Sequence, residues 1–569
     1  MRFITKDDIE SPNNSKNKII DPPPSREGPH MMFIFYDTET TGLQKSFSQI
    51  VQIALVFTDD NMNILSSKKL ESRRSPWVIP SPGSMLITGF TPDDLKNAKL
   101  SHFEMMQETD KWIRSQYQPI LFSGFNTMGY DEDVLSHNLH QTLLDPWLTI
   151  SRNDANGQQN GHFDIDRVVR AVVAYMPGTL KLDILNEQGY PSLSLMNVAS
   201  QNGVPLNHED AHDAMNDIRA TVGLAKVMKK LAPQIWDHML TLSTQAGVED
   251  FMAKNKVFTQ GWTVSGKRGG VVVTAAASRE GDTSEILFDL GQDPTPFLSM
   301  TAEQLRDAIL AQDEEKNKYK KKAFRVADKD RQPLIMPLDM SDAVLPATFD
   351  EKLAETRADM IQSNAQFRQN LGKAAAMARD VKYPPYANPK PEQLMNDYPE
   401  GPVKAKVEAW TKEFRAAPTW KDAAALLGDF YTRFEQELKQ DPKLRSFVQF
   451  AGRIVFEHAP TELSQEQQDQ MKVYIASHVL NQDPKASYTT IAIARKELAE
   501  IEKERAEGRP RWKEVTDTQI RSLKLYYTAL EKEYAPYLPA SAPVPPVNDN
   551  AAPPVAPTKK AANDKFKPK

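Results

Sequence analysis

The sequence contains no cysteine among its 569 residues, which excludes disulfide bonds, thiolate metal sites and cysteine nucleophiles. It also lacks any apolar run near the roughly 18 residues that a membrane-spanning helix needs, so we expect no membrane association. The first 30 residues contain no apolar stretch typical of a secretory signal. A chain without cysteine fits a reducing compartment, and we expect a cytoplasmic protein.

The sequence has no surplus of positive charge either. Its 70 Lys and Arg residues face 76 Asp and Glu residues, which gives a net charge of -6. Many nucleic-acid-binding proteins are basic overall, so any such contact here would have to come from a local basic groove. An acidic balance also fits an enzyme that binds metal through carboxylates, and the total charge therefore favours neither class.

The length of the chain predicts several domains, since a single hydrophobic core rarely serves so many residues. Composition and hydrophobic patterning divide it into five parts. We predict a disordered leader (1–30), an α/β domain (31–232), a small β-rich domain (233–345), a helical domain (346–539) and a disordered Pro/Ala/Lys-rich tail (540–569).

Apolar runs and helical periodicity support this division. In the first domain the runs "MMFIFYD", "IVQIALVFTD" and "PILFSGFN" predict strands, and residues 101–117 have helical spacing. In the second, "GWTVSG", "GGVVVTAAAS" and "EILFDLG" predict short strands, followed by a helix with a capping box at Thr301 and Gln304. A similar box at Thr516 and Gln519 opens a helix of the third domain.

The first motif with chemical potential is "FIFYDTETTGL". Asp37 and Glu39 are two residues apart on a predicted strand, so their carboxylates project from the same face. Paired carboxylates on a rigid element suit a hard divalent cation. Two solvated acids at a strand end are nevertheless the more common reading of this motif alone.

Two further motifs carry acidic residues at predicted helix starts. In "SGFNTMGYDEDVL", Asp131 stands where a helix begins, a position in which a carboxylate can simply stabilise the helix dipole. In "DAHDAMNDIRATVGLAKVMKKL", Asp217 lies in the first turns of an amphipathic helix and His212 lies just before it. An ordinary surface helix with a surface histidine would explain this motif alone.

Taken together, the three motifs favour catalysis. Four carboxylates in one α/β domain match a site for two metal ions, which can hold the attacking and leaving oxygens of an in-line phosphoryl displacement. We predict Mg²⁺ (two ions), with Mn²⁺ as an alternative, bound by the predicted metal ligands Asp37, Glu39, Asp131 and Asp217. His212, with a side-chain pKa near neutrality, suits deprotonation of the attacking water.

"DTET", "FNTMGYD" and "HDAMND" resemble the three motifs of the DEDDh exonuclease superfamily, whose core is an RNase H-like sheet. The stretches "GSMLITGFTPDDL", "DPW" and "PSLSLMNVASQNGV" are similar to the bacterial exodeoxyribonuclease I family within it. The resemblance extends to about residue 540 and weakens along the chain. It implies an RNase H-like α/β exonuclease domain, an SH3-like β-rich domain and an α-helical C-terminal domain.

The resemblance also implies roles for individual residues. Asp37, Glu39, Asp131 and Asp217 would bind metal, His212 would be the general base, and Glu39 would also face the terminal nucleotide. One position departs from the family pattern. Where the family usually carries a substrate-contacting arginine, this chain has Ser194, which we keep as a predicted substrate-binding position.

The implied activity is 3′–5′ hydrolysis of single-stranded DNA to 5′-mononucleotides, with a role in DNA repair and recombination. The resemblance implies a further partner, the acidic C-terminal tail of single-strand DNA-binding protein, and we expect a monomer. An RNase or a proofreading exonuclease of the same superfamily is the first alternative. A non-catalytic DNA-binding scaffold is the second, and the presence of all five predicted catalytic residues argues against it.

Overall fold

A computed structural model of the chain describes residues 31–116, 119–150, 159–205, 214–264, 267–278, 283–314, 322–345, 347–384, 386 and 388–538. The predicted leader, the predicted tail and His212 lie outside the described residues. Among the helices of the described ranges, none has the length and apolar character needed to cross a membrane.

The first sheet is mixed and contains five strands in the order β3-β2-β1-β4-β5. β1 pairs antiparallel with β2 and parallel with β4, and β4 pairs parallel with β5. The predicted strands of the first domain are therefore confirmed. Their bounds are β1 Met32–Thr40, β2 Ile50–Thr58, β3 Ile64–Glu71, β4 Ile120–Gly124 and β5 Gly161–Asp164.

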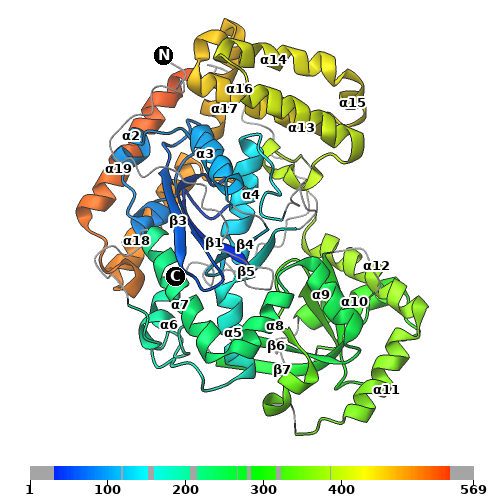
Figure 1. Cartoon of the computed structure of the whole chain (residues 1–569). Coiled ribbons are helices and arrows are strands. Elements are labelled where there is room, and N and C mark those ends of the chain that lie inside the picture. The colour runs from blue at the N-terminus through cyan, green and yellow to red at the C-terminus, as the bar shows by residue number, and fades with distance from the viewer. Residues whose placement is uncertain are drawn as a thin grey trace.

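Helices cover both faces of this sheet, and they bury the side chains on both faces of its central strand, β1. Phe33 and Phe35 of β1 enter one core, and Ile34 and Tyr36 enter the other. Figure 1 shows α3 and α4 on one side of the sheet and α5 and α7 on the other. The helices of this part are α1 Pro82–Thr88, α2 Pro92–Asn97, α3 His102–Arg114, α4 Asp131–Gln141, α5 Ile165–Tyr175, α6 Leu195–Gln201 and α7 Ala214–Leu231.

The second sheet is antiparallel and also five-stranded, in the order β10-β6-β7-β8-β9. It includes the three predicted strands, and the helix that follows them opens with the predicted capping box of Thr301 and Gln304. Its elements are β6 Phe258–Val264, β7 Lys267–Ala276, β8 Ser284–Asp289, α10 Ala302–Glu314, β9 Phe324–Asp328 and β10 Ile335–Met336.

The rest of the described chain is helical, as predicted. The helices are α11 Glu351–Gln362, α12 Ala365–Lys382, α13 Gly401–Arg415, α14 Trp420–Arg433, α15 Glu435–Gln440, α16 Arg445–His458, α17 Gln465–Val479, α18 Ile491–Ala506 and α19 Asp517–Tyr534. Two short 3-10 turns, η4 (Pro391–Gln393) and η5 (Met395–Asp397), lie between α12 and α13. Thr516 and Gln519 form the predicted capping box of α19.

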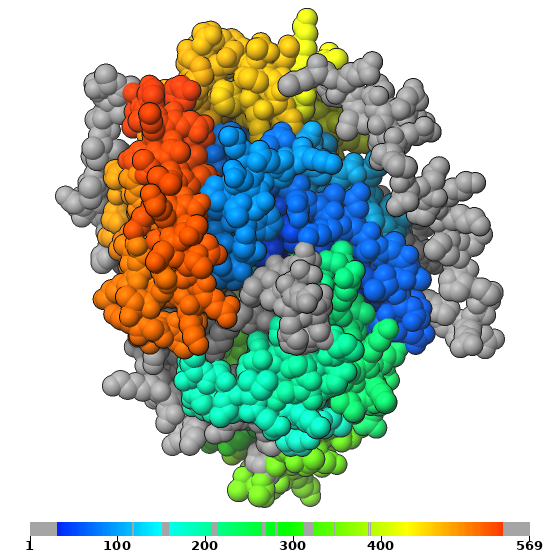
Figure 2. All heavy atoms as spheres, turned by 90° about the vertical axis from the view of Figure 1, so that its left-hand side faces the viewer, coloured from blue at the N-terminus to red at the C-terminus, as the bar shows by residue number. Residues whose placement is uncertain are grey.

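The hydrophobic cores do not follow the predicted domain limits. Two helices near residue 233, α8 (Pro233–Thr241) and α9 (Gln245–Lys254), bury Trp236 and Phe251 in the same core as β1 and α7. α11 and α12 pack on the second sheet, and α17 to α19 pack on α1 and α2. Figure 2 shows the last helices, in orange and red, lying along the blue N-terminal part. The domain limits themselves stay a prediction.

Candidate active site

The first two predicted site residues lie on β1, the central strand of the first sheet. Asp37 and Glu39 follow Phe33 and Phe35 in the alternation of the strand, so all four belong to the face covered by α5 and α7. Asp37 is buried and Glu39 is half-buried. The shared face that the sequence predicted for the two carboxylates is confirmed.

Asp131, the first residue of α4, reaches β1 from the opposite face of the sheet. Thr38, between the two acids of β1, donates from its Oγ1 to Asp131 Oδ1 at 2.6 Å, and its backbone N–H donates to the same oxygen at 3.3 Å. These bonds tie Asp131 to the residue of β1 that lies between Asp37 and Glu39. Burial raises the pKa of Asp131 to about 7.

The turn before Asp131 is held by a second buried acid, Asp164 at the end of β5. Its carboxylate accepts from the backbone N–H groups of Asn126 at 2.8 Å and Met128 at 3.1 Å. Burial raises the pKa of Asp164 to about 6. At Gly124, a Cβ would lie 2.8 Å from the Tyr36 carbonyl oxygen, so only glycine lets β4 end this close to β1.

A third buried acid, Glu132, holds the first turn of α4 to the sheet. The Tyr36 hydroxyl donates to its Oε2 at 2.7 Å, and His162 Nε2 lies 3.2 Å from its Oε1. Although burial acts to raise it, the pKa of Glu132 is lowered to about 2 by the charge of His162 and by its hydrogen bonds. These contacts fix Glu132 at the start of α4, and Glu132 thereby helps to position the neighbouring Asp131.

The last carboxylate comes from α7, which crosses the same face of β1 and β2. Asp217 lies in the first turn of this helix and is buried. The backbone N–H of Ala214, at the start of α7, donates to Gln52 Oε1 at 3.2 Å. Gln52 lies opposite Glu39 in the register of β1 and β2, so the helix begins beside the two acids of β1.

The elements that carry the four predicted metal ligands thus meet at one end of the first sheet. Within the described ranges, no group of three or more His, Asp or Glu side chains is arranged as in a metal site. The assignment of Asp37, Glu39, Asp131 and Asp217 as ligands stays a prediction, as does that of His212, which lies outside the described residues.

Ser194, the predicted substrate contact, is the N-cap residue of α6 and is half-buried. Its Oγ lies 3.2 Å from that of Ser192, and α6 packs against α7 through Val198. Its role toward a substrate stays a prediction.

Sequence reasoning missed the residues that hold the acids in place. Thr38 could have been found, since the residue between two acids on a strand must point to the other face, where α4 begins. Asp164 ends the short strand β5, whose residues "GHFD" do not form an apolar run that would have predicted it. Glu132 carries no separate signal in a stretch of three consecutive acids.

A groove of about 550 Å³ opens along the first turns of α4, where Asp133 and His137 line it. One wall carries Lys45, from the loop after β1, and His137, from α4; Arg331 comes from the loop between β9 and β10. Asp133 joins them, 2.5 Å from Lys45 Nζ and 2.6 Å from Arg331 Nη2. The groove therefore carries two cationic side chains, Lys45 and Arg331, that share the single carboxylate of Asp133.

Comparisons with known proteins agree with this geometry. Residues 34–225 match the family described as Exonuclease. The chain is 30% identical over 206 residues to exodeoxyribonuclease I of Buchnera aphidicola (36% of this chain, 41% of the relative). It is 26% identical over 284 residues to exodeoxyribonuclease I of Escherichia coli (49% of this chain, 58% of the relative). The matched stretches thus span about half the length of these relatives.

Solved structures share the fold over a longer part of the chain. Exonuclease I from Methylocaldum szegediense superposes with a TM-score of 0.70 at 20% identity, over 88% of this chain and 100% of the other. E. coli exonuclease I in complex with a 5cy-dT13 oligonucleotide superposes with a TM-score of 0.66 at 17% identity, over 89% of this chain and 99% of the other. A structure described as the ExoI/SSB-Ct complex superposes with a TM-score of 0.65 at 16% identity, over 90% of this chain and 100% of the other. The RNase H-like exonuclease fold of the first part is thereby shown.

Proposed function

We propose that this chain, whose residues 34–225 match the exonuclease family, is a 3′–5′ exonuclease that hydrolyses single-stranded DNA to 5′-mononucleotides. The observation that carries the proposal is the bond from Thr38 to Asp131, which brings α4 to the carboxylates of β1. We place the enzyme in DNA repair and recombination, in keeping with its similarity to exodeoxyribonuclease I.

The donor chemistry of the four candidate ligands suits a divalent cation. All four candidate ligands, Asp37, Glu39, Asp131 and Asp217, are carboxylates, the donors that Mg²⁺ and Mn²⁺ prefer. Burial raises the pKa of Asp131 to about 7, and a bound cation would stabilise its charged form. Two bound Mg²⁺ ions would stabilise the charge on the attacking and leaving oxygens.

The chain's own residues would orient the substrate and move the proton. His212 is proposed to accept the proton of the attacking water, because a neutral imidazole is a competent base near pH 7. Ala214, two residues later, is bonded to Gln52, so the chain enters α7 beside β1. Glu39 would also face the terminal nucleotide, and Ser194 is a proposed substrate contact in place of an arginine.

The groove gives the strand a path away from the carboxylates. Lys45, His137 and Arg331 could contact phosphates along it, since single strands bind in positively charged grooves. We propose that the second sheet, assigned as an SH3-like domain, and the helical C-terminal domain close this groove around the strand. Arg331 supports this, because it joins the second sheet to Asp133 of α4.

A protein partner is proposed on similarity alone. One solved relative is in complex with SSB-Ct, and we propose that this chain binds the acidic C-terminal tail of single-strand DNA-binding protein. Titration of that peptide against the protein, followed by fluorescence anisotropy, tests this proposal. A scrambled peptide of the same charge is the control, and equal affinity for both peptides would refute specific recognition.

The substrate assignment is tested by comparing four labelled substrates with Mg²⁺ present: single-stranded DNA, the same strand with a blocked 3′ end, duplex DNA and RNA. We expect rapid release of 5′-mononucleotides from the first substrate only. Preference for RNA would refute the substrate assignment, and cleavage of the blocked strand would refute the 3′–5′ direction. Binding without any cleavage would favour the scaffold alternative.

A further inference from the structure

A buried ion pair holds the segment between α12 and α13. Glu392, in η4, and Arg453, in α16, are both almost fully buried (3% and 4% exposed), and Arg453 Nη1 lies 2.6 Å from Glu392 Oε1. Although burial acts to raise it, the pKa of Glu392 is below its usual range because of the Arg453 charge. A buried pair of this kind is ionised and costs desolvation to form.

Arg453 is itself fixed from several sides. Its guanidinium lies over the rings of Tyr474 (4.7 Å), Phe450 (5.4 Å) and Trp77 (5.8 Å). These rings come from α17, from α16 and from the loop that precedes α1. Because three elements position the cation, the carboxylate that binds it is held at one place relative to the first sheet.

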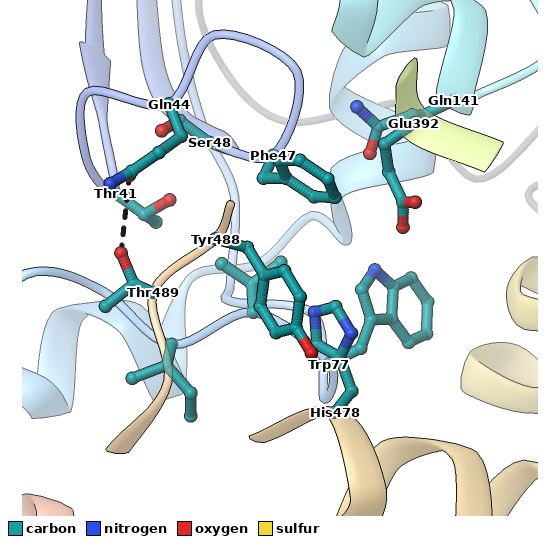
Figure 3. A pocket seen from close by; sticks show the side chains of 12 residues that line it. Thr41, Gln44, Phe47, Ser48, Trp77, Gln141, Glu392, His478, Tyr488 and Thr489 are labelled. Atoms are coloured by element: carbon teal, nitrogen blue, oxygen red, sulfur yellow. Dashed lines mark hydrogen bonds between the residues drawn. The ribbon is translucent and has the colours of Figure 1, made fainter. Parts of the chain in front are cut away.

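Further contacts hold the segment on both sides of Glu392. Lys390 Nζ lies 4.9 Å from the ring centre of Tyr488, and that ring stacks on His478 at 3.7 Å. Tyr398 packs against the edge of His140 of α4 at 5.8 Å. Figure 3 shows Glu392 entering a small pocket beside Trp77, His478 and Tyr488. Within the described residues, Glu392 Oε2 has no hydrogen-bond partner there.

The residues directly after Glu392 form part of the groove. Gln393, Met395 and Asn396 line it on the side facing Lys45 and His137. Gln393 is half-buried and Asn396 is exposed, so little apolar burial of their own fixes these two side chains. Their position depends on the buried residues of the same segment, which are Glu392 with its ion pair and the apolar Leu394 and Met395.

We propose that the Glu392–Arg453 pair positions one wall of the groove, and so sets how firmly a single-stranded oligonucleotide is held beyond the reactive end. The pair touches neither substrate nor the candidate metal ligands; both residues are positioning residues. A purely apolar contact could hold the turn with equal stability, but an ion pair fixes a single arrangement. The inference rests on the proposed function.

The test compares Glu392→Gln with the wild type on two substrates: a short oligonucleotide that reaches only the carboxylates and a long one that also fills the groove. We expect KM for the long strand to rise about tenfold. Without the ion pair, one or two side chains of the groove wall would lose their fixed position and would have to be ordered when the strand binds. We expect kcat on both strands, and KM on the short one, to stay unchanged. Glu392→Asp, which keeps the charge, should recover part of the loss.

The matched control is Glu413→Gln, which removes the exposed ion pair between Glu413 and Arg433 at 2.8 Å in the same helical part. It should leave both substrates unaffected. If Glu392→Gln fails to fold, the double variant Glu392→Leu with Arg453→Met replaces the pair by apolar residues and should show the same split. An unchanged KM for the long strand in a folded variant would overturn the proposal, as would equal losses on both strands.

Binding of the long strand without metal separates this proposal from the proposed function. A wild type that binds the strand but does not cut it after Mg²⁺ is added would contradict the exonuclease proposal, while weaker metal-free binding by Glu392→Gln would still support the positioning role. If the wild type binds no single strand at all, both proposals fail.

Discussion

At the scale of single residues, the carboxylate of Asp131 is the most constrained part of the candidate site. It is buried, it accepts two hydrogen bonds from Thr38, and burial raises its pKa to about 7. A buried carboxylate with a raised pKa lowers the stability of the metal-free fold and favours a bound cation. One substitution of Asp131 therefore affects stability and cation binding in opposite directions.

We predict that Asp131→Asn will lower cleavage by about 10³-fold or more, since groups that act together in a site are each essential. The same change should raise the melting temperature of the metal-free protein, because a buried charge is removed while the side-chain shape is kept. Mg²⁺ should stabilise the wild type and not the variant. Nuclease assays and thermal melts with and without Mg²⁺ check both effects.

The control is Asp93→Asn, which neutralises an exposed acid of α2 and should change neither activity nor the response to Mg²⁺. An Asp131→Asn protein that is still stabilised by Mg²⁺ as strongly as the wild type would show that the cation binds elsewhere.

His140 of α4 is a buried histidine whose ring is packed among aromatic rings. Its ring lies edge-on to Tyr398, Phe447 and Phe450, and neither ring nitrogen has a hydrogen-bond partner among the described residues. Burial lowers its pKa to about 3. The folded protein therefore keeps this ring neutral, whereas the unfolded chain protonates it below about pH 6.5.

The sign of the pH effect follows from that difference. The stability tied to neutral His140 is fully present above pH 6.5 and is lost as the pH falls toward 3, by at most about 1.4 kcal/mol per pH unit. We predict that His140→Leu will flatten the loss of stability between these values, measured by denaturant unfolding at a series of pH values. Phe447→Leu should instead lower stability equally at every pH, and an unchanged slope in His140→Leu would contradict the assignment.

Several site residues were predictable from the sequence for a local reason. Alternation along a strand places Asp37 and Glu39 on one face, and the capping position of Asp131 and the helical phase of Asp217 are equally local. Thr38, Asp164 and Glu132 act through contacts between distant segments, such as the bond from Thr38 to Asp131 across 93 positions. Strand alternation gives the face on which Thr38 lies, but no local pattern gives its partner or the partners of Asp164 and Glu132.

At the scale of elements, the close approach of β4 to β1 depends on Gly124. A Cβ there would lie 2.2 Å from the Thr127 side chain and 2.8 Å from the Tyr36 carbonyl oxygen. We predict that Gly124→Ala will lower the free energy of unfolding by about 1–3 kcal/mol through overpacking and will also lower activity, because the turn leading to Asp131 must shift. Denaturant unfolding and single-strand cleavage measure the two effects.

A glycine in a different setting provides the control. Gly428 lies inside α14, and a Cβ there would meet no atom within 4 Å. Gly428→Ala should therefore raise stability by about 0.5–1 kcal/mol through helix propensity and leave activity unchanged. Equal effects of the two substitutions would show that the packing at Gly124 is not limiting.

The elements themselves were largely predictable, whereas their partners were not. Apolar runs and periodicity indicated β1, β2, β4, β6, β7 and β8, because each pattern reflects which side of an element is buried. The pattern does not say what covers that side. The burial of Trp236 and Phe251 with β1, and of Phe367 and Leu371 with the second sheet, thus came only from the structure.

At the scale of the whole molecule, the cores join segments that are far apart in sequence. Leu498 of α18 and Tyr527 of α19 share one core with Met85 and Leu95 near the first sheet. The Tyr527 hydroxyl also donates to the Pro80 carbonyl at 2.9 Å. Helices α11 and α12 instead share a core with the second sheet. Helices α13 to α16 share a further core with Phe103 of α3 and Leu143. The helical part is therefore divided among three cores.

This division predicts which regions loosen together. Leu498→Ala should leave a cavity costing about 2–5 kcal/mol and should increase hydrogen exchange in α1 and α2 as well as in α18 and α19. Exchange in α11 and α12 should stay unchanged. Leu371→Ala in α12 should do the reverse, loosening β8 and sparing α1 and α2.

Hydrogen-exchange mass spectrometry of the intact protein distinguishes the possibilities. If Leu498→Ala affects only α18 and α19, the C-terminal helices are an independent unit, and α1 and α2 do not depend on them. If α1 and α2 respond together with α18 and α19, the C-terminal helices support the segment between β3 and α3, which includes Trp77. Because the Trp77 ring lies over Arg453, the same variant should then also weaken binding of a long single strand.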